Sequence, residues 1–272
     1  MTEAVAGIAD DRFASRSPDG TEIVVWVRGR GPALVLVHGS IQDHTGSAEL
    51  VHELAPDFTT FALDRRGFGA SGDTAPYDLR REFEDVAAVV DAVADRVGGT
   101  VAVWGHSFGA GVALGGAALT TNVSRLVLYE PSLGIRYPAG WMEKVEEAVT
   151  KGDHEEAVVL LLRDVLGFTA EQIDEVRARS DWQARLAAAP TMAREARAEE
   201  SWRYPPGKLE GVIAPTLLLS GSESPASVRQ PTDAAARALR GARVHVLPGH
   251  AHVAHRTDPA MVAAVVRGFL GS

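Results

Sequence analysis

The chain has 272 residues, 46% of them hydrophobic, no cysteine and a formal net charge of −9. This length suits one large α/β domain with or without an inserted segment, and the lack of cysteine excludes disulfides and thiol chemistry. The acidic balance argues against partners such as nucleic acid and anionic membranes, because both attract basic patches. No basic stretch precedes an apolar one at the start, and no apolar run reaches about 18 residues. We therefore expect a cytoplasmic protein without a secretory signal or membrane span.

The first part of the chain alternates apolar runs with helical patterns. Short apolar runs bounded by turn residues predict strands, and these cover 12–16, 22–27, 33–37, 58–63, 100–104 and 125–129. Helical periodicity of the apolar residues predicts helices over 78–97 and about 108–119.

The strand signal stops at about residue 132 and resumes after about residue 210. Roughly three to five helices are expected in between, with Asp153 and Thr169 as N-caps because Glu156 and Gln172 follow three residues later.

Beyond this stretch, strands are expected over 215–220 and 242–247, and helices over 231–240 and 258–270. The alternation predicts an α/β fold, with a mostly parallel eight-stranded sheet and helices on both faces. Residues 1–131 and 211–272 would form this core, and residues 132–210 a helical cap inserted in it.

The most informative motif is the sequence G-H-S-F-G at residues 105–109, directly after a buried strand. A strand followed by G-x-S-x-G and a helix is typical of a nucleophile elbow, in which a tight turn exposes the serine. The helix would point its N-terminus, with its partial positive charge, at Ser107. This suits a site where an oxyanion develops.

Together with three further motifs, the elbow resembles the α/β-hydrolase fold family. The resemblance rests also on His38-Gly39 after the third strand, on D-R-R-G-F-G-A-S at 64–71, and on L-P-G-H-A-H at 247–252 before the closing helix. It covers nearly the whole chain outside 132–210 and implies the order nucleophile, acid, histidine along the chain. The family hosts many chemistries, so the fold alone does not identify the substrate.

The resemblance implies that Ser107 is the nucleophile and that a histidine before the last helix is its base. The family's usual spelling, a glycine and two spacers before the histidine, places the base at His252, with His250 as the alternative. The backbone N–H groups of Ser40 and Phe108 would form the oxyanion hole.

The acid has two candidates. The common family position follows the strand 215–220, where this chain has Glu223 and, in the slot usual for aspartate, Ser224. The other is Glu130, at the end of the strand after the elbow helix, where many haloalkane dehalogenases and the fungal zearalenone lactonases carry the acid. We favour Glu130, because a carboxylate at the mouth of a buried strand needs a partner.

Other polar residues are interpreted as structural. His38, Asp64 and Arg65 would shape loops, and His106 would pack away from Ser107. His245 is interpreted as structural within a strand, and at least one of His250 and His255 as an exposed loop residue.

Two features of the predicted cap are open to interpretation. The charge run 194–200 is expected to form a solvated helix face. Trp141, Trp182 and Trp202 would either face an apolar or ring-bearing substrate or pack the cap onto the core.

These residues predict a serine hydrolase that cleaves an ester or lactone of an apolar small molecule through an acyl-enzyme, with no cofactor and no metal. Ser107 argues against dehalogenase and epoxide hydrolase chemistry, for which the family resemblance implies an aspartate. Carbon–carbon bond hydrolases, thioesterases and perhydrolases share the serine and stay open, as does a non-hydrolytic ligand-binding or cyclase member. The sequence also leaves open a homodimer.

Overall fold

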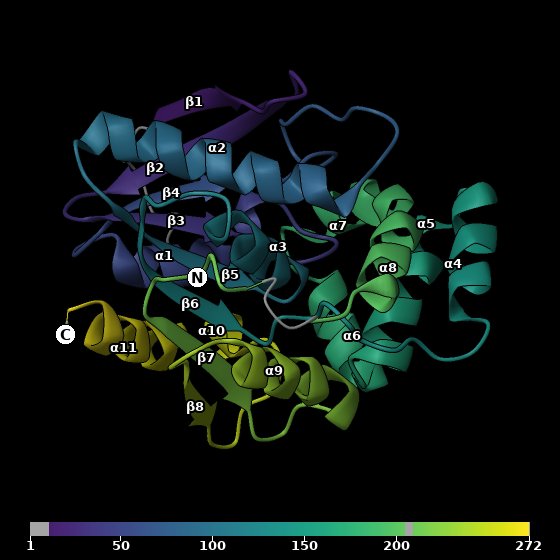
Figure 1. Cartoon of the computed structure of the whole chain (residues 1–272). Coiled ribbons are helices and arrows are strands. Elements are labelled where there is room, and N and C mark those ends of the chain that lie inside the picture. Colours follow the sequence, from purple (N-terminus) through teal and green to yellow (C-terminus); the bar gives the residue numbers. More distant parts are fainter. Residues whose placement is uncertain (1–10, 205–208, 272) are drawn as a thin grey trace.

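An eight-stranded sheet forms the centre of the protein, described from a computed structural model over residues 11–204 and 209–271 (Figure 1). The strands are β1 (Asp11–Arg16), β2 (Glu22–Gly29), β3 (Ala33–Val37), β4 (Thr59–Leu63), β5 (Val101–His106), β6 (Val123–Tyr129), β7 (Thr216–Gly221) and β8 (Arg243–Leu247). Their order is β1-β2-β4-β3-β5-β6-β7-β8. β2 pairs antiparallel with β1 and β4, and the other pairs are parallel. The predicted fold class is confirmed.

Helices cover both faces of the sheet (Figure 1). α2 (Leu79–Val97), α3 (Phe108–Ala117) and α9 (Ala226–Ala238) share one apolar core with the sheet. On the other face, α1 (Ala48–Leu54), α10 (Ala254–Thr257) and α11 (Pro259–Leu270) share a second core. Every residue of β3 and β5 is buried, which explains why 33–37 and 101–104 are continuous apolar runs rather than alternating ones.

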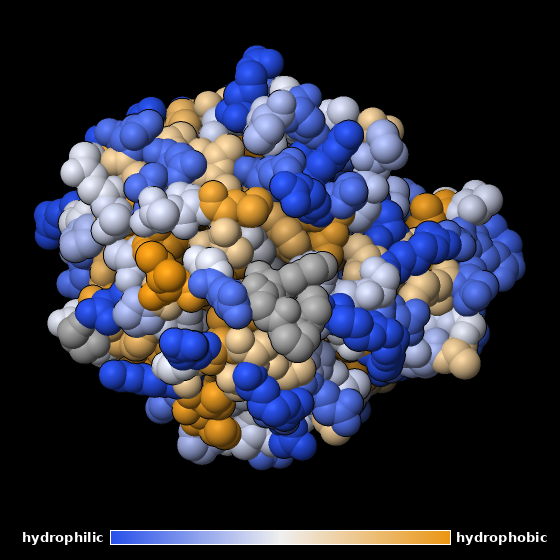
Figure 2. Space-filling model, viewed as in Figure 1, coloured by the Kyte–Doolittle hydropathy of each residue, from blue (hydrophilic) through white to orange (hydrophobic). Residues whose placement is uncertain are grey.

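Between β6 and β7 the chain forms helices that lie together beyond one end of the sheet (Figure 1). These are α4 (Trp141–Thr150), α5 (His154–Leu160), the π-helical turn η2 (Leu161–Val165), α6 (Ala170–Arg177), α7 (Trp182–Ala188), the short η3 (Ala189–Thr191) and α8 (Met192–Ser201). They share a third apolar core. Figure 2 shows that the surface of this part is mostly hydrophilic on the face in view, so its apolar side chains turn inward.

Helix caps follow local chemistry. The Asp78 carboxylate accepts a hydrogen bond from the Arg80 N–H at the start of α2, and Gly98 ends the helix with a φ of 68°. Thr169 and Gln172 form a complete capping box at α6. In the described residues, no helix combines the length and apolar character that crossing a bilayer requires.

Three helix predictions differ from the structure. The sequence pattern predicts no helix at the short α1 or α10. α9 begins at Ala226 rather than at 231, and Pro231 lies inside it. Since proline lacks an N–H and favours the first helical turn, its position indicated a helix start where the structure has a helix interior.

The charged stretch 194–200 is not the solvated face that its sequence predicts. It belongs to α8, and its Glu195 and Glu199 are buried. Arg65, which follows β4, contacts Glu195 and donates from Nε to Glu82 of α2 at 2.8 Å. Buried charges are tolerated when paired in this way, so Arg65 connects α8 to the core.

The sequence predicts that at least one of His250 and His255 lies on an exposed loop, and the structure separates the two. The His250 side chain is 25% exposed on the loop between β8 and α10, whereas His255 is fully buried in α10. His245 lies within β8 and its side chain is exposed. The alternation around His245 does not indicate burial, because in the described residues β8 has a neighbouring strand on one side alone and its first four residues face solvent.

Candidate active site

Ser107 occupies a strained turn between β5 and α3. Its φ is 55° and its ψ −126°, and its N–H donates to the Tyr129 carbonyl at 2.9 Å. A Cβ at Gly109 would lie 2.1 Å from the His38 carbonyl oxygen, and one at Gly105 2.6 Å from the Ala110 Cα. Only glycine fits at these two positions, and this is the physical reason for the G-x-S-x-G pattern.

A continuous hydrogen-bonded chain joins Ser107, His252 and Glu130. His252 lies on the loop between β8 and α10, and its Nε2 is 3.0 Å from the Ser107 Oγ. Its Nδ1 is 2.6 Å from the Glu130 Oε2. Glu130 and His252 are 0% and 3% exposed. Because an ionised carboxylate accepts only, Nδ1 carries the proton and Nε2 is free to accept the serine proton.

Glu130 is held as a carboxylate at the end of β6. Its φ of 45° turns the chain sharply after the strand. Its Oε1 accepts from the Gly221 N–H at 2.8 Å and from the Ser220 hydroxyl at 3.3 Å. Burial acts to raise the pKa of Glu130, but the hydrogen bond and charge of His252 outweigh it, so this pKa lies below its usual value.

The structure places Glu130, rather than Glu223, against His252. Both ring nitrogens of His252 already have partners, in Glu130 and Ser107. Glu223 is exposed, and its carboxylate accepts from the Ser222 hydroxyl at 2.9 Å. His250, the alternative base, lies 3.7 Å from the Asp258 carboxylate. The predicted serine, histidine and acid thus come together, while the two alternatives lie apart from the chain.

Two buried side chains form hydrogen bonds to the backbone of the loop that carries His252. The His106 Nε2 is 2.8 Å from the His252 carbonyl oxygen. Burial lowers the pKa of His106 well below its usual value. A neutral His106 therefore donates from Nε2 to this carbonyl. The Tyr129 hydroxyl contacts the Ala251 carbonyl and accepts from the Ala254 N–H at 3.2 Å.

The segment after β3 passes directly beside the serine. A Cβ at Gly39 would lie 3.1 Å from the Ser107 Cβ, and Ser40 lines the adjoining cavity. Phe108 opens α3, so the N-terminus of that helix lies at the serine. Both predicted oxyanion-hole residues are therefore next to Ser107, and their role as donors stays a prediction.

His38 shapes this segment, in line with its structural interpretation. Its Nε2 accepts from the Arg65 N–H at 3.0 Å, and its Nδ1 donates to the Gly39 carbonyl at 2.8 Å. Burial and the Arg65 charge lower the pKa of His38 to about 4. The ring is therefore neutral at pH 7 and fixes the loop that leads to Ser40.

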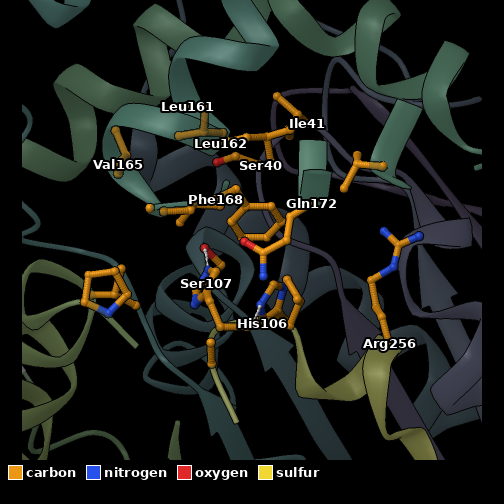
Figure 3. A pocket seen from close by; sticks show the side chains of 18 of the residues that line it. Ser40, Ile41, His106, Ser107, Leu161, Leu162, Val165, Phe168, Gln172 and Arg256 are labelled. Carbon is orange, nitrogen blue, oxygen red and sulfur yellow. Dashed lines mark hydrogen bonds between the residues drawn. The ribbon is translucent and has the colours of Figure 1, made fainter. Parts of the chain in front are cut away.

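A cavity of about 540 Å³ lies over Ser107. Its apolar lining includes five side chains in the upper half of the view in Figure 3: Ile41, Leu161, Leu162, Val165 and Phe168. The cavity also has charged and polar lining residues, among them Gln172, Arg179, Arg185, Glu199 and Arg256. No motif in the sequence marks these residues as part of a site, and the charge run 194–200 predicts a solvated position for Glu199.

The three tryptophans of the 132–210 segment are not in the lining of this cavity. Trp141 stacks on Tyr137 with ring centroids 4.6 Å apart, and Trp202 packs edge-on against Phe83 of α2 at 5.5 Å. The alternative in which they pack the helical segment is thus the better one. Aliphatic residues of η2, signalled by the run L-L-L at 160–162, supply the apolar wall instead.

Glu199 is a buried acid at the same cavity. The hydroxyls of Ser132 and Tyr137 contact its carboxyl group. Burial is the main cause that raises its pKa to about 8, so Glu199 is mostly protonated at pH 7. The acid therefore adds little negative charge to the cavity at neutral pH.

Replacing Glu199 by glutamine is expected to change how stability depends on pH. A native pKa of about 8 against the usual 4.5 means that the folded state holds the proton more tightly. The contribution of Glu199 to the free energy of unfolding therefore falls as the pH rises from 4.5 to about 8, by on the order of a few kcal/mol in total. Glutamine does not titrate, so the variant should gain stability relative to wild type from pH 5 to pH 8.5. Urea unfolding at several pH values measures this; a constant difference would contradict the raised pKa.

Asp43, His44 and Asp64 bring potential metal-ligand atoms within 4.8 Å of one another in the described part of the chain. Asp64 already accepts from the His44 Nδ1 at 2.7 Å, the Trp26 Nε1 at 3.0 Å and the Ala70 N–H at 2.9 Å. These bonds lower the pKa of Asp64 to about 2, against the raising effect of burial. The group is explained as a loop support after β4, consistent with the interpretation of Asp64 as structural.

Comparison with known proteins agrees with this fold. A family model described as "Alpha/beta hydrolase family" matches residues 34–265. A 2-(acetamidomethylene)succinate hydrolase from Mesorhizobium japonicum is 26% identical over 98% of this chain and 99% of its own length. A pimeloyl-[acyl-carrier protein] methyl ester esterase from Stenotrophomonas maltophilia is 38% identical over 45% of each chain. The crystal structure of an alpha/beta hydrolase from Sphaerobacter thermophilus matches with a TM-score of 0.80 and 30% identity, covering 95% of this chain and 100% of that one.

Proposed function

The chain belongs to the alpha/beta hydrolase family, and from that premise we propose that it is a serine hydrolase that cleaves a carboxylic ester or lactone through an acyl-enzyme. The observation that carries this proposal is the chain from Ser107 to His252 to Glu130, with distances of 3.0 and 2.6 Å. A serine hydroxyl is a weak nucleophile until a base takes its proton, and this chain supplies the base and its support.

Acylation begins when the substrate carbonyl lies next to the Ser107 Oγ. His252 takes the serine proton at Nε2 while Oγ attacks the carbonyl carbon. Glu130 holds the Nδ1–H and stabilises the imidazolium that forms. The carboxylate is suited to this task because the Gly221 N–H fixes its second oxygen at 2.8 Å.

The tetrahedral intermediate carries negative charge on the former carbonyl oxygen. In our proposal the backbone N–H groups of Ser40 and Phe108 donate to this oxygen, with the N-terminus of α3 adding its positive end. His252 then passes the proton to the leaving oxygen, and an ester releases its alcohol. With a lactone, that oxygen stays attached to the acyl group.

Deacylation uses the same groups in reverse. His252 activates a water molecule, which attacks the acyl-enzyme carbonyl, and the returned proton restores the Ser107 hydroxyl. The product is a carboxylic acid, or a hydroxy acid from a lactone.

Substrate shape is proposed from the cavity. A volume of about 540 Å³ suits a small molecule, and the wall of Leu161, Leu162, Val165 and Phe168 suits an apolar chain or ring. We assign the helices of the 132–210 segment the role of a cap over the core, because η2 places Leu161, Leu162 and Val165 in the lining of the cavity beside Ser107. The names of the relatives describe hydrolases, and one of them an esterase, which supports hydrolysis as the reaction.

A fluorophosphonate probe tests the proposal. The probe phosphonylates an activated serine, so intact protein should gain one adduct, mapped to Ser107 by peptide mass spectrometry. Protein unfolded in urea should not react, because activation depends on His252. A folded wild type that stays unlabelled would contradict the proposal and favour a non-hydrolytic member of the family.

A further inference from the structure

Three arginines line the cavity that adjoins Ser107. Arg185 lies on α7, Arg256 on α10, and Arg179 just beyond α6. The side chains of Arg185 and Arg256 are each 6% exposed, and that of Arg179 is 37% exposed. Figure 3 shows Arg256 rising from α10 at one side of the cavity, with Ser107 toward the middle. Two buried guanidinium groups at a substrate cavity need a physical explanation.

The acidic partners nearby do not balance these charges. Asp181 accepts from the Nη2 atoms of Arg185 and Arg256 at 3.0 and 2.8 Å on the same oxygen, and lies 3.4 Å from the Arg179 Nε. Arg179 also pairs with Glu49. Within the described part of the chain, three guanidinium groups therefore face two carboxylates, which leaves one positive charge. His255, buried nearby, adds none, because burial lowers its pKa well below its usual value.

Donors of the two buried arginines are unused. Over residues 11–204 and 209–271, the Arg185 Nε and the Arg256 Nη1 are buried and have no hydrogen-bond partner. An unsatisfied buried donor on a charged group is costly. Burial and the neighbouring Arg256 charge lower the pKa of Arg185 to about 10, which reflects the same imbalance. An anion placed there would supply both the missing charge and the missing acceptors.

The rest of the cavity does not oppose an anion. Glu199, the buried acid, is mostly protonated at pH 7, as shown above. Glu175 and Glu223 line the cavity too, but both are exposed and so are screened by water. Arginine is the side chain best matched to a carboxylate, because its planar group donates two parallel hydrogen bonds.

We propose that the substrate carries a free carboxylate, which binds at Arg185 and Arg256 while the scissile carbonyl lies at Ser107. This inference rests on the proposed hydrolase function and specifies its substrate class: half-esters of dicarboxylic acids, or lactones with a carboxylate substituent. The apolar wall of η2 would contact the chain between the two polar ends. The carboxylate would also orient the substrate within the cavity. One end of the substrate would bind the arginines, and the scissile carbonyl at the other end would lie at Ser107.

A pair of substrates of equal shape tests this inference. One is 4-nitrophenyl hydrogen adipate, and its neutral twin has the terminal carboxylate replaced by a primary amide. Because hydrogen bonds to charged groups are strong, we expect wild-type kcat/KM to be about 10- to 100-fold higher for the half-ester. Arg256→Met and Arg185→Met should each reduce this ratio toward 1, mainly through the KM of the half-ester. Arg256→Lys should retain part of it.

The control is Arg177→Met on α6, an exposed arginine that pairs with Asp174 at 2.7 Å and is not in the cavity lining. It should leave the ratio unchanged. A wild-type ratio near 1 would overturn the inference. So would an equal loss of kcat/KM for both twins in the Arg256 and Arg185 variants, because that result indicates a structural role.

A second measurement uses the wild-type protein and does not require turnover of a substrate. Adipate should slow the labelling of wild-type Ser107 by a fluorophosphonate, whereas adipamide should not. Equal or absent protection by both compounds would overturn the carboxylate site. Absence of labelling and of turnover of either twin would instead overturn the proposed hydrolase function. Turnover of the neutral twin without preference for the half-ester would leave that function standing and reject the carboxylate site alone.

Discussion

Ser107→Ala is expected to abolish ester hydrolysis, lowering kcat by on the order of 10⁶. The variant keeps His252, Glu130 and the backbone donors, but it has no oxygen that can form the acyl-enzyme. Residual activity would come from water attack on a bound substrate, assisted by the remaining groups. The measurement is kcat with a 4-nitrophenyl ester, together with loss of fluorophosphonate labelling.

Stability should hardly change in this variant. The contact that holds the turn, from the Ser107 N–H to the Tyr129 carbonyl at 2.9 Å, belongs to the backbone. The φ of 55° at this position is no more strained for alanine than for serine. We therefore expect the free energy of unfolding to stay within about 0.5 kcal/mol of the wild-type value. Ser201→Ala, which removes a hydroxyl at an exposed position of α8, is the matched control. A Ser107→Ala variant with a tenth or more of wild-type activity would place the nucleophile elsewhere.

Sequence predicted the strands well because burial on both faces leaves a strong local signal. β3, β5 and β7 are fully buried along their length, and each contains an uninterrupted apolar run, at 33–37, 101–104 and 217–219. The nucleophile elbow is also predictable from the sequence. A Cβ at Gly105 or Gly109 would make contacts shorter than 3 Å, so glycine is required at both positions. Features set by close backbone packing leave small residues in fixed positions, and such residues can be recognised in one sequence.

Short helices were harder to predict. α1 spans seven residues, and Ser47 before it makes no side-chain cap hydrogen bond. Its stability comes from Leu50 and Leu54 packing in the core shared with α11, rather than from a local signal. In α9, Pro231 indicated a helix start, whereas the helix extends from Ala226.

Buried charges were the least predictable feature, because their partners are remote in sequence. Glu195 meets Arg65 from 130 positions away, and Glu199 meets Ser132 from 67 positions away. A charged residue with no visible partner is reasonably expected to face water. The same holds for Arg256 of the cavity, which meets Asp181 from 75 positions away.

Replacing Glu130 by glutamine is expected to lower kcat by about 10⁴. The amide has nearly the shape of the carboxylate, so it can stay beside Gly221, but it is neutral. It cannot stabilise the imidazolium, and its NH₂ group favours the His252 tautomer with the proton on Nε2. That tautomer cannot accept the Ser107 proton. The measurement is kcat with the ester used for Ser107→Ala, with thermal unfolding to show that the variant is folded.

Glu223→Gln is the matched control, because it makes the same chemical change in the competing acid. Glu223 is exposed and bonds to Ser222, so its variant should retain kcat within about threefold. The reverse pattern, with a large loss in Glu223→Gln and little in Glu130→Gln, would reject Glu130 as the acid. The 2.6 Å contact between Glu130 and His252 would then be a structural ion pair. Comparable losses in both variants would indicate that Glu223, which lines the cavity, also acts in the reaction.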